Sequence, residues 1–304
     1  MIRGKNTLHV MVGFLRGMRY FDILILLAFP TMGAVFAIDA WSVPIALRFV
    51  VFCICNAFFL AHVFSFNDIS GAHLHPDEPE IRARHALKNL DAKNRAPLFF
   101  SIVLLAASLV GYALLDLVIL FFASAIAVLC ALYSHHHINL KGVPVASALI
   151  LLSCPLLYFY TGWIAFAPFT AKTAMMGIFF ATVLLAGHFS NEIQDFEQDR
   201  CASITTNAIR FGKLTVFRFG LVLFVASSAF LAYVSYAFFD GIRYFIISLI
   251  LLGSWLAVSS AFWRTPQSIE SNIATFRSIY RVIYAAYCLA VFVIRGIDWI
   301  SIAR

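Results

Sequence analysis

The chain has 304 residues, of which 62% are hydrophobic and 12% are charged, and its mean hydropathy is +0.90. Soluble globular domains carry about 25% charged residues, so this composition excludes an ordinary soluble domain. The formal net charge of +7 is typical of basic loops on one side of a membrane and does not indicate nucleic-acid binding.

Apolar segments long enough for membrane helices follow one another along the chain, and about nine of them can be drawn. They lie at roughly 21–38, 43–64, 96–114, 117–134, 145–166, 173–190, 216–238, 242–263 and 279–294. This pattern predicts an all-α membrane protein with about nine transmembrane helices. No small-residue cleavage site follows the first segment, so we expect that segment to be retained as a helix.

Basic residues are concentrated in alternate connections between these segments. One set comprises the N-terminus and the connections near 65–95, 135–144, 191–215 and 264–278. Together with Arg218 and Arg281, which lie just inside the apolar segments that follow the last two connections, it carries 17 of the 22 Lys and Arg residues. By the positive-inside rule, we expect this set in the cytoplasm and the C-terminus outside. The protein is therefore expected to be a multi-pass protein of a bacterial-type inner membrane or its equivalent.

The first long polar connection follows the second apolar segment. It begins with Asn67-Asp68-x-x-Gly71-x-x-x-His75, a series whose positions recur every four residues and share one face of a helix. We expect Asp68 to be a metal ligand, with His75 or Asp77 as possible additional ligands. A polar cytoplasmic loop without a metal is the alternative interpretation.

Two arginines, Arg82 and Arg84, follow this series. A guanidinium group binds phosphate oxygens through two hydrogen bonds at once, so a basic pair beside an acidic metal site suits a diphosphate. For each arginine alone, the positive charge typical of a cytoplasmic loop is an equally simple explanation.

A polar tract follows the fourth apolar segment. Its three consecutive histidines, His135 to His137, suggest a metal site, but neighbouring helical residues diverge by about 100° and cannot all bind one ion. We therefore expect the histidines to be interfacial polar residues. Lys141, which precedes a Gly-x-Pro turn, is the better candidate for contact with a phosphate.

The second long polar connection follows the sixth apolar segment directly. Asn191, Asp195 and Asp199 recur every four residues and share one helix face. A carboxylate at the end of a membrane helix is costly unless something binds it. Magnesium is commonly held by one or two carboxylates together with phosphate oxygens and water. This stretch therefore predicts metal-diphosphate chemistry at a membrane surface.

Glu192 adds a further acidic group to this stretch, and we expect it to be a fourth possible metal ligand. His188 precedes it by one turn and is either a functional group or a hydrogen-bonded structural histidine. The alternative interpretation of the whole stretch is a solvated helix end whose acids interact with Arg200 and Arg210.

The two polar series indicate an internal repeat within a single domain, 1–304, with halves at about 14–144 and 145–304. Four apolar segments separate the series, and each series leaves an apolar segment on the same side of the membrane. Two facing copies would form a two-walled site for a metal and a phosphate. The residues that we expect to be catalytic are Asp68, Asp195 and Asp199.

In these features the chain resembles the UbiA superfamily of intramembrane prenyltransferases over nearly its whole length. That family carries N-D-x-x-D-x-x-x-D after its second helix and D-x-x-x-D-x-x-x-D after its sixth. It also carries R-x-R-P, Y-S-x-x-x-x-x-x-K-G-x-P and T-L-A-V-x-x-G tracts. The first acidic series corresponds here to Asn67 and Asp68, and the second to Asn191, Glu192, Asp195, Asp199 and Arg200. The R-x-R-P tract corresponds to Arg82, Arg84 and His85, and the Y-S tract to Tyr133, Ser134, Lys141, Gly142 and Pro144. The T-L-A-V-x-x-G tract corresponds to Thr206 to Gly212.

The resemblance implies transmembrane helices around a central cavity that opens to the cytoplasmic face. It also implies a Mg²⁺-dependent transfer of a polyprenyl group from its diphosphate to an aromatic, quinone-precursor or lipid acceptor. The donor would ionise at its allylic C–O bond, and the acceptor would attack the resulting carbocation-like group. The expected substrate-binding residues are Asn67, Arg82, Arg84, Tyr133, Lys141, Asn191, Arg200 and Arg210.

The chain departs from the family pattern at several positions. Gly71 and His75 replace the second and third acids of the first series, and Ile204 and Thr205 stand where a lysine is common. These departures are compatible with a single strongly bound metal ion. They also leave two alternative functions open, namely a membrane terpene cyclase of the same fold and a carrier or scaffold without catalysis.

Overall fold

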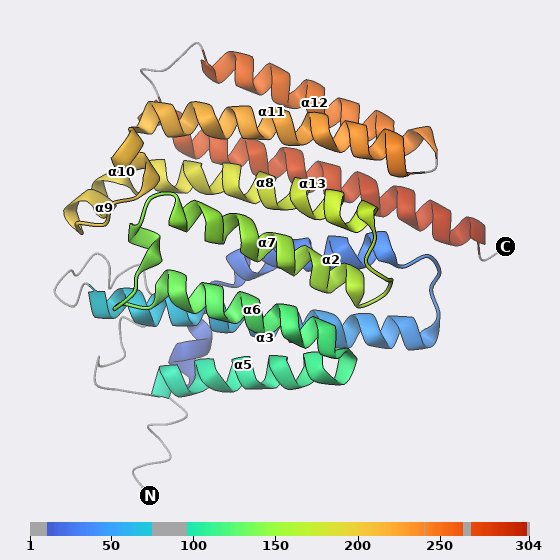
Figure 1. Ribbon diagram of the computed structural model, residues 1–304, viewed down its shortest axis with the longest axis horizontal. Helices are drawn as coiled ribbons and strands as arrows, with labels where there is room; N and C mark the ends of the chain where they lie inside the picture. The colour runs from blue at the N-terminus through green and yellow to red at the C-terminus, as the bar shows by residue number, and fades with distance from the viewer. Residues whose placement is uncertain (1–10, 75–95, 240, 264–268, 303–304) are drawn as a thin grey trace, which may run out of the picture. The chain divides into compact units, whose positions relative to one another are not determined.

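The computed structural model describes residues 11–74, 96–239, 241–263 and 269–302 (Figure 1). Within these ranges the regular elements are helices, and there is no β-strand. In chain order they are α2 (Tyr20–Ala37), α3 (Val43–Leu74), α5 (Ala96–Leu115), α6 (Leu117–Ser134), η1 (Leu140–Gly142), α7 (Ala146–Ile164), α8 (Ala171–Gln194), α9 (Phe196–Cys201), α10 (Asn207–Phe211), α11 (Lys213–Phe238), α12 (Ile242–Trp263) and α13 (Ile269–Ile302).

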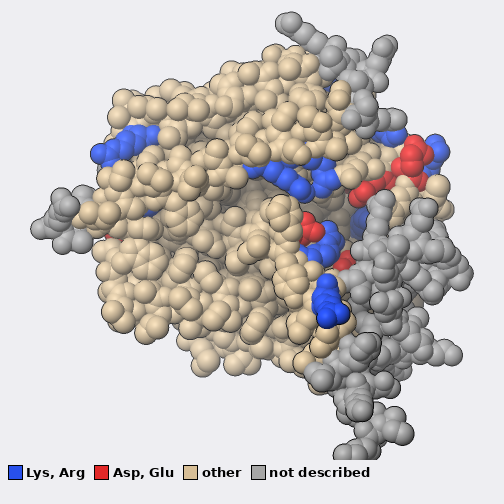
Figure 2. Space-filling model, turned by 180° about the vertical axis from the view of Figure 1, so that it is seen from behind, with Lys and Arg blue, Asp and Glu red and all other residues tan. Residues whose placement is uncertain are grey.

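Nine helices among the described residues are long and apolar enough to cross a membrane. The prediction of an all-α protein with about nine spans is therefore confirmed. Figure 2 shows one face on which most of the surface is uncharged, as expected for a protein whose helices contact lipid. The protein is an integral, multi-pass membrane protein.

Several helices extend beyond the apolar segments from which they were predicted. α3 continues to Leu74, so Asn67 and Asp68 lie on a helix and not in a loop. α8 continues to Gln194, and α13 covers 269–302 where the apolar run predicted only 279–294. Hydropathy marks the apolar part of a helix, whereas the backbone hydrogen-bond ladder continues into polar sequence.

The described chain divides into two compact units. One comprises Met1–Thr31 and Ser42–Leu140, and the other comprises Met32–Trp41 and Lys141–Arg304. The C-terminal part of α2 therefore belongs to the second unit, a division that the repeat in the sequence does not reveal. The first unit contains the first polar series, and the second unit contains Lys141 and the second polar series.

Buried polar groups of the first unit are paired inside the apolar core. The hydroxyl of Tyr112 donates a hydrogen bond of 2.8 Å to the side-chain oxygen of Asn56, whose amide donates to the carbonyl of Phe52. The Nδ1 atom of His62 lies 2.9 Å from the hydroxyl of Ser101. Because no water is available in a bilayer core, the Tyr112–Asn56 and His62–Ser101 pairs help to fix how α5 packs against α3.

The second unit packs α8 against α7, α11 and α13. α8 begins with a reciprocal cap, in which the Thr170 hydroxyl accepts from the Thr173 backbone and the Thr173 hydroxyl accepts from the Thr170 backbone. Gly33 of α2 lies so close to the backbone of Phe159 in α7 that a side chain at this position would collide with it. Small residues permit such close helix contacts in membranes.

The end of α2 is capped by α13 within the same unit. The Arg295 guanidinium donates to the carbonyl groups of Val35 and Ile38, and the Trp299 indole N–H donates to Ile38 at 2.8 Å. These bonds satisfy carbonyl groups that the last helical turn leaves without intrahelical partners.

Candidate functional site

The second polar series forms a ladder along one helix face. Asp195 lies at the junction between α8 and α9, with φ −90° and ψ 4°. Its N–H donates to the carbonyl of Asn191 at 2.9 Å, and the N–H of Asp199 donates to the carbonyl of Asp195 at 2.8 Å. The four-residue hydrogen-bond spacing thus continues through the junction, so the side chains of the three residues follow one another along the same face.

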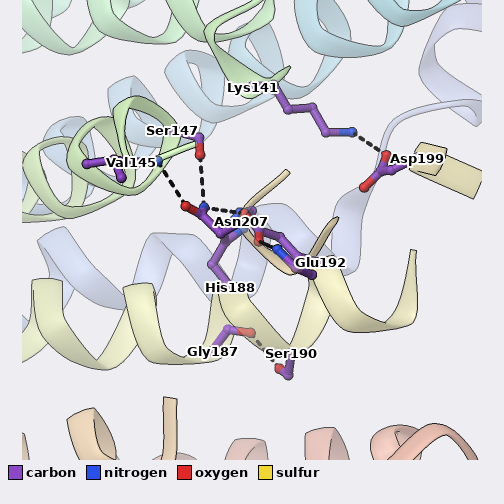
Figure 3. Close-up of polar contacts among 10 residues, drawn as sticks. Lys141, Val145, Ser147, Gly187, His188, Ser190, Glu192, Asp199 and Asn207 are labelled. Atoms are coloured by element: carbon purple, nitrogen blue, oxygen red, sulfur yellow. Dashed lines mark hydrogen bonds and ion pairs between the residues drawn. The ribbon is translucent and has the colours of Figure 1, made fainter. Parts of the chain in front are cut away.

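Asp199 is 4% exposed and lies beside Lys141, whose ammonium nitrogen is 3.6 Å from its Oδ1 (Figure 3). Burial raises the pKa of the Asp199 carboxyl above its ordinary value, because the charged form is poorly solvated. The negative charges of Asp195 and Glu192 also raise the pKa, while Lys141 opposes the shift. The ionised ladder would therefore gain from a further cation.

Asn191 supplies an unused oxygen to this ladder. Its side-chain Oδ1 is buried and has no hydrogen-bond partner among the described residues. Buried polar atoms are nearly always paired, so an unpaired acceptor at the mouth of a membrane helix indicates a ligand. An amide oxygen is a suitable donor to a hard divalent cation.

The donor set of the ladder fits Mg²⁺. No three His, Cys, Asp or Glu side chains in the described ranges are grouped closely enough to hold a metal by themselves. Magnesium does not require such a group, since it usually retains waters and takes substrate phosphate oxygens besides one or two carboxylates. Asp195, Asp199 and the free oxygen of Asn191 provide this partial set.

Glu192 is 3% exposed and is engaged differently from the other members of the series. Its Oε1 accepts a hydrogen bond of 2.9 Å from the side chain of Asn207, and its Oε2 accepts one of 3.0 Å from the backbone of Ala208. The Nε2 atom of His188 lies 3.2 Å from Oε1 (Figure 3). Because protein groups already occupy both oxygens, this geometry favours a structural role for Glu192.

Asn207 extends this contact to a third helix. Its side-chain oxygen accepts from the N–H of Val145 at 2.9 Å, and its amide also donates to the Ser147 hydroxyl at 3.2 Å (Figure 3). Glu192 and Asn207 thereby join the end of α8 to the starts of α10 and α7. We did not predict a role for Asn207. The signal in the sequence is a polar residue where the similar family tract, T-L-A-V, has leucine.

The first polar series lies on α3, in the first unit. Asp68 is 5% exposed, and an Nη1 atom of Arg19 lies 3.8 Å from its Oδ1. Arg19 also pairs with Asp22 at 2.7 Å. The side-chain oxygen of Asn67 accepts a hydrogen bond of 3.0 Å from Ser134, at the end of α6. Sequence spacing does not connect Arg19 with Asp68, so this pair is visible only in the structure.

The remaining predicted residues differ in their exposure and in their partners. Arg200 is exposed and pairs with Glu197 at 2.7 Å. For this residue, the pair agrees with the alternative interpretation, a solvated helix end whose acids interact with nearby arginines. Arg210 is exposed at the end of α10, and Tyr133 is half-buried on α6. The rings of His136 and His137 are 4.0 Å apart between centroids, without a metal-binding group among the described residues. The predicted residues outside the described ranges are His75, Asp77, Arg82 and Arg84.

Both the sequence and the fold of this chain are similar to those of known proteins. The sequence matches the UbiA prenyltransferase family over residues 26–280. A UbiA homologue from Archaeoglobus fulgidus bound to Cd²⁺ has a TM-score of 0.71 and 18% identity, over 93% of this chain and 99% of that one. The A. fulgidus homologue bound to GPP and Mg²⁺ has a TM-score of 0.69 and 18% identity, over 92% and 99% of the two chains.

A structure of a digeranylgeranylglyceryl phosphate synthase is also similar, with a TM-score of 0.67 and 15% identity over 93% of this chain and 97% of that one. These likenesses show a shared fold. No curated protein matches the sequence.

Proposed function

This chain belongs to the UbiA prenyltransferase family, and on that premise we propose that it transfers a polyprenyl group from its diphosphate to an acceptor within the membrane. The family and the fold support prenyltransferase activity in general, because structures of similar proteins contain GPP or DMAPP with Mg²⁺. The observation that carries the proposal is the ladder of Asn191, Asp195 and Asp199 at the end of a membrane helix, with Lys141 beside it.

In this proposal Asn191, Asp195 and Asp199 hold Mg²⁺ by their side-chain oxygens. Bound magnesium supplies positive charge that offsets the negative charge developing on a departing diphosphate. Asp68 stays a predicted metal ligand from the first series, with Arg19 as its neighbouring cation. Glu192 is assigned to positioning, because its oxygens are already bound by the protein.

Lys141 donates hydrogen bonds to phosphate oxygens in the proposed mechanism and keeps the diphosphate beside Asp199. Arg210, which is exposed at the end of α10, is a second phosphate-binding residue in this proposal. The allylic C–O bond breaks, and its electron pair leaves with the diphosphate. The electron-deficient prenyl carbon is then attacked by an aromatic or lipid acceptor, which loses a proton. The apolar helices exclude water, which would otherwise capture the cation.

The ladder is tested by replacing its carboxylates in purified protein. We expect Asp195→Ala and Asp199→Ala each to reduce Mg²⁺-dependent release of pyrophosphate from geranylgeranyl diphosphate to background. Glu197→Gln is the matched control, because Glu197 lies on the same short helix but is exposed and pairs with Arg200 and Lys213. Release that is unchanged in both ladder variants would overturn the proposal.

The products of the same reaction separate the alternatives. A transferase yields a prenylated acceptor, whereas a cyclase yields a hydrocarbon from the donor alone. A carrier or scaffold yields neither and does not consume the donor in a Mg²⁺-dependent manner. Lipid mass spectrometry of cells with and without the protein would identify the acceptor and the product together.

A further inference from the structure

Two arginines lie one helical turn apart inside a membrane-spanning helix of the second unit. Arg277 and Arg281 belong to α13, within its candidate span Asn272–Ile300, and both are half-buried. Their four-residue spacing places them on one face of the helix. Arg277 lies just before the apolar segment 279–294, and Arg281 lies within it. A charged residue such as Arg281 inside a membrane span is costly and is usually retained for a function.

Arg277 has an unsatisfied donor. Its Nε atom is buried and has no hydrogen-bond partner among the described residues. A guanidinium nitrogen that cannot reach water and donates to no protein group is destabilising by itself. An oxyanion would accept a hydrogen bond from this nitrogen, and Arg281, one turn away on the same face, is a second charged donor beside it.

The depth of this pair follows from the contacts between α13 and α8. The ring of Tyr280 lies 3.4 Å from where a Cβ of Gly187 would be, and Phe179 contacts Tyr284 and Tyr287. Earlier residues of α8 thus meet later residues of α13, and the two helices are antiparallel.

With a helix rise of about 1.5 Å per residue, these contacts give the position of other residues along the axes of α8 and α13. Arg277 lies about 4.5 Å from the level of Tyr280, towards the end of the bundle where the polar ladder begins. Asn191 lies about 6 Å from the level of Gly187 in the same direction. Arg277 is therefore level with the start of the ladder, and Arg281 lies about one turn deeper among apolar residues.

We propose that Arg277 and Arg281 bind an anionic group of the acceptor, a carboxylate or a phosphate. This inference rests on the proposed function, in which the diphosphate of the donor occupies the ladder and Lys141. Arg277 lies at the depth where the ladder begins, and Arg281 lies one turn deeper, on a different helix from the ladder. An anion site at this position suits a second, membrane-soluble substrate. The planar guanidinium groups match the paired oxygens of either anion.

Binding of defined probes to the full chain tests the site directly. The protein is placed in phosphatidylcholine nanodiscs, and the affinities of dodecyl phosphate and 2-naphthoate are compared with those of their neutral analogues, dodecanol and 2-naphthalenemethanol. We expect at least one anion to bind better than its neutral analogue. Arg277→Gln and Arg281→Gln should each weaken that anion by about tenfold or more, the loss of one charge-assisted hydrogen bond.

Two further variants control for folding and for charge. Arg277→Lys keeps the charge but loses the forked geometry, so it should fold as the wild type does and bind with intermediate affinity. Arg243→Gln removes an exposed arginine that pairs with Asp298 at 3.6 Å, and it should leave probe binding unchanged. Equal affinities for every anion in the wild type and in both Gln variants would overturn the proposal.

The two proposals fail in different ways. If Asp195→Ala and Asp199→Ala both retain pyrophosphate release, the proposed function fails whatever the probes do. If Arg277→Gln weakens donor binding but not probe binding, the arginines belong to the diphosphate and the acceptor site is wrong. Tight binding of phosphatidylglycerol, without binding of either soluble anion, would make the pair a lipid-headgroup site and would also overturn the inference.

Discussion

The amide of Asn207 donates a hydrogen bond of 2.9 Å to the buried carboxylate of Glu192, across 15 positions of sequence. Asn207 also binds Val145 and Ser147 at the start of α7. Through these two side chains, the helix that carries the ladder is joined to the segment that follows Lys141. The pair therefore positions the groups that the proposed mechanism uses, without contributing a ligand.

Glu192→Ala is expected to destabilise the protein. It removes the acceptor for the Asn207 amide and for the Ala208 N–H, and each buried donor left unpaired costs about 1–3 kcal/mol. Thermal unfolding in detergent should show a lower Tm, while Glu197→Ala, at an exposed position on α9, should leave it nearly unchanged. If Glu192 were instead a metal ligand, Glu192→Ala would weaken Mg²⁺ binding at an unchanged Tm.

A double-mutant cycle measures the coupling between Glu192 and Asn207. Asn207→Leu restores the leucine of the similar T-L-A-V tract but removes the donor to Glu192. We expect the free-energy losses of Glu192→Gln and Asn207→Leu to be non-additive, because both changes break one hydrogen bond, with a coupling of about 0.5–3 kcal/mol. Strictly additive losses in chemical unfolding would mean that the two side chains act independently.

Lys141→Ala is expected to raise the KM for the prenyl diphosphate by about tenfold or more, since it removes a charge-assisted contact to phosphate. Lys141→Arg should retain part of the affinity, because it keeps the positive charge near Asp199. Pyrophosphate release measured across donor concentrations checks this. An unchanged KM in Lys141→Ala would assign the lysine only to its ion pair with Asp199.

Asn191→Ala is expected to weaken Mg²⁺ binding with little change in stability. The side-chain oxygen of Asn191 has no hydrogen bond to lose, in contrast to that of Asn207. Isothermal titration of Mg²⁺ in the presence of a non-hydrolysable diphosphate analogue gives the affinity, and thermal unfolding gives the stability. A large fall in Tm with normal Mg²⁺ affinity would show that Asn191 is structural.

Acidification is expected to weaken Mg²⁺ binding at a higher pH than for an exposed aspartate. Burial raises the pKa of Asp199, so its carboxyl takes up a proton earlier as the pH falls, and a protonated carboxyl is a poor ligand. Asp199→Asn should reduce this dependence. In the metal-free protein, acidification should instead stabilise the folded state, because between the two pKa values the folded state binds more protons than the unfolded state. The free energy of unfolding should then fall as the pH rises from the ordinary aspartate pKa through the raised one.

The sequence by itself determined the class of the fold and the ladder. Runs of apolar residues specify membrane helices locally, because each span must satisfy its own backbone hydrogen bonds. The four-residue spacing of Asn191, Asp195 and Asp199 likewise fixes a common face wherever the chain is helical, and the structure keeps that spacing through the junction at Asp195.

Only the tertiary structure decided which polar groups are already paired. Glu192 looks equivalent to its neighbours in sequence, yet Asn207 and Ala208 occupy both of its oxygens. Asp68 meets Arg19 only because the chain just before α2 lies beside α3, where Arg19 also covers the ring of Phe64. Partners of this kind lie 15 to 62 positions apart. Local composition cannot specify them, because a buried polar group takes whichever partner the packing of the helices brings to it.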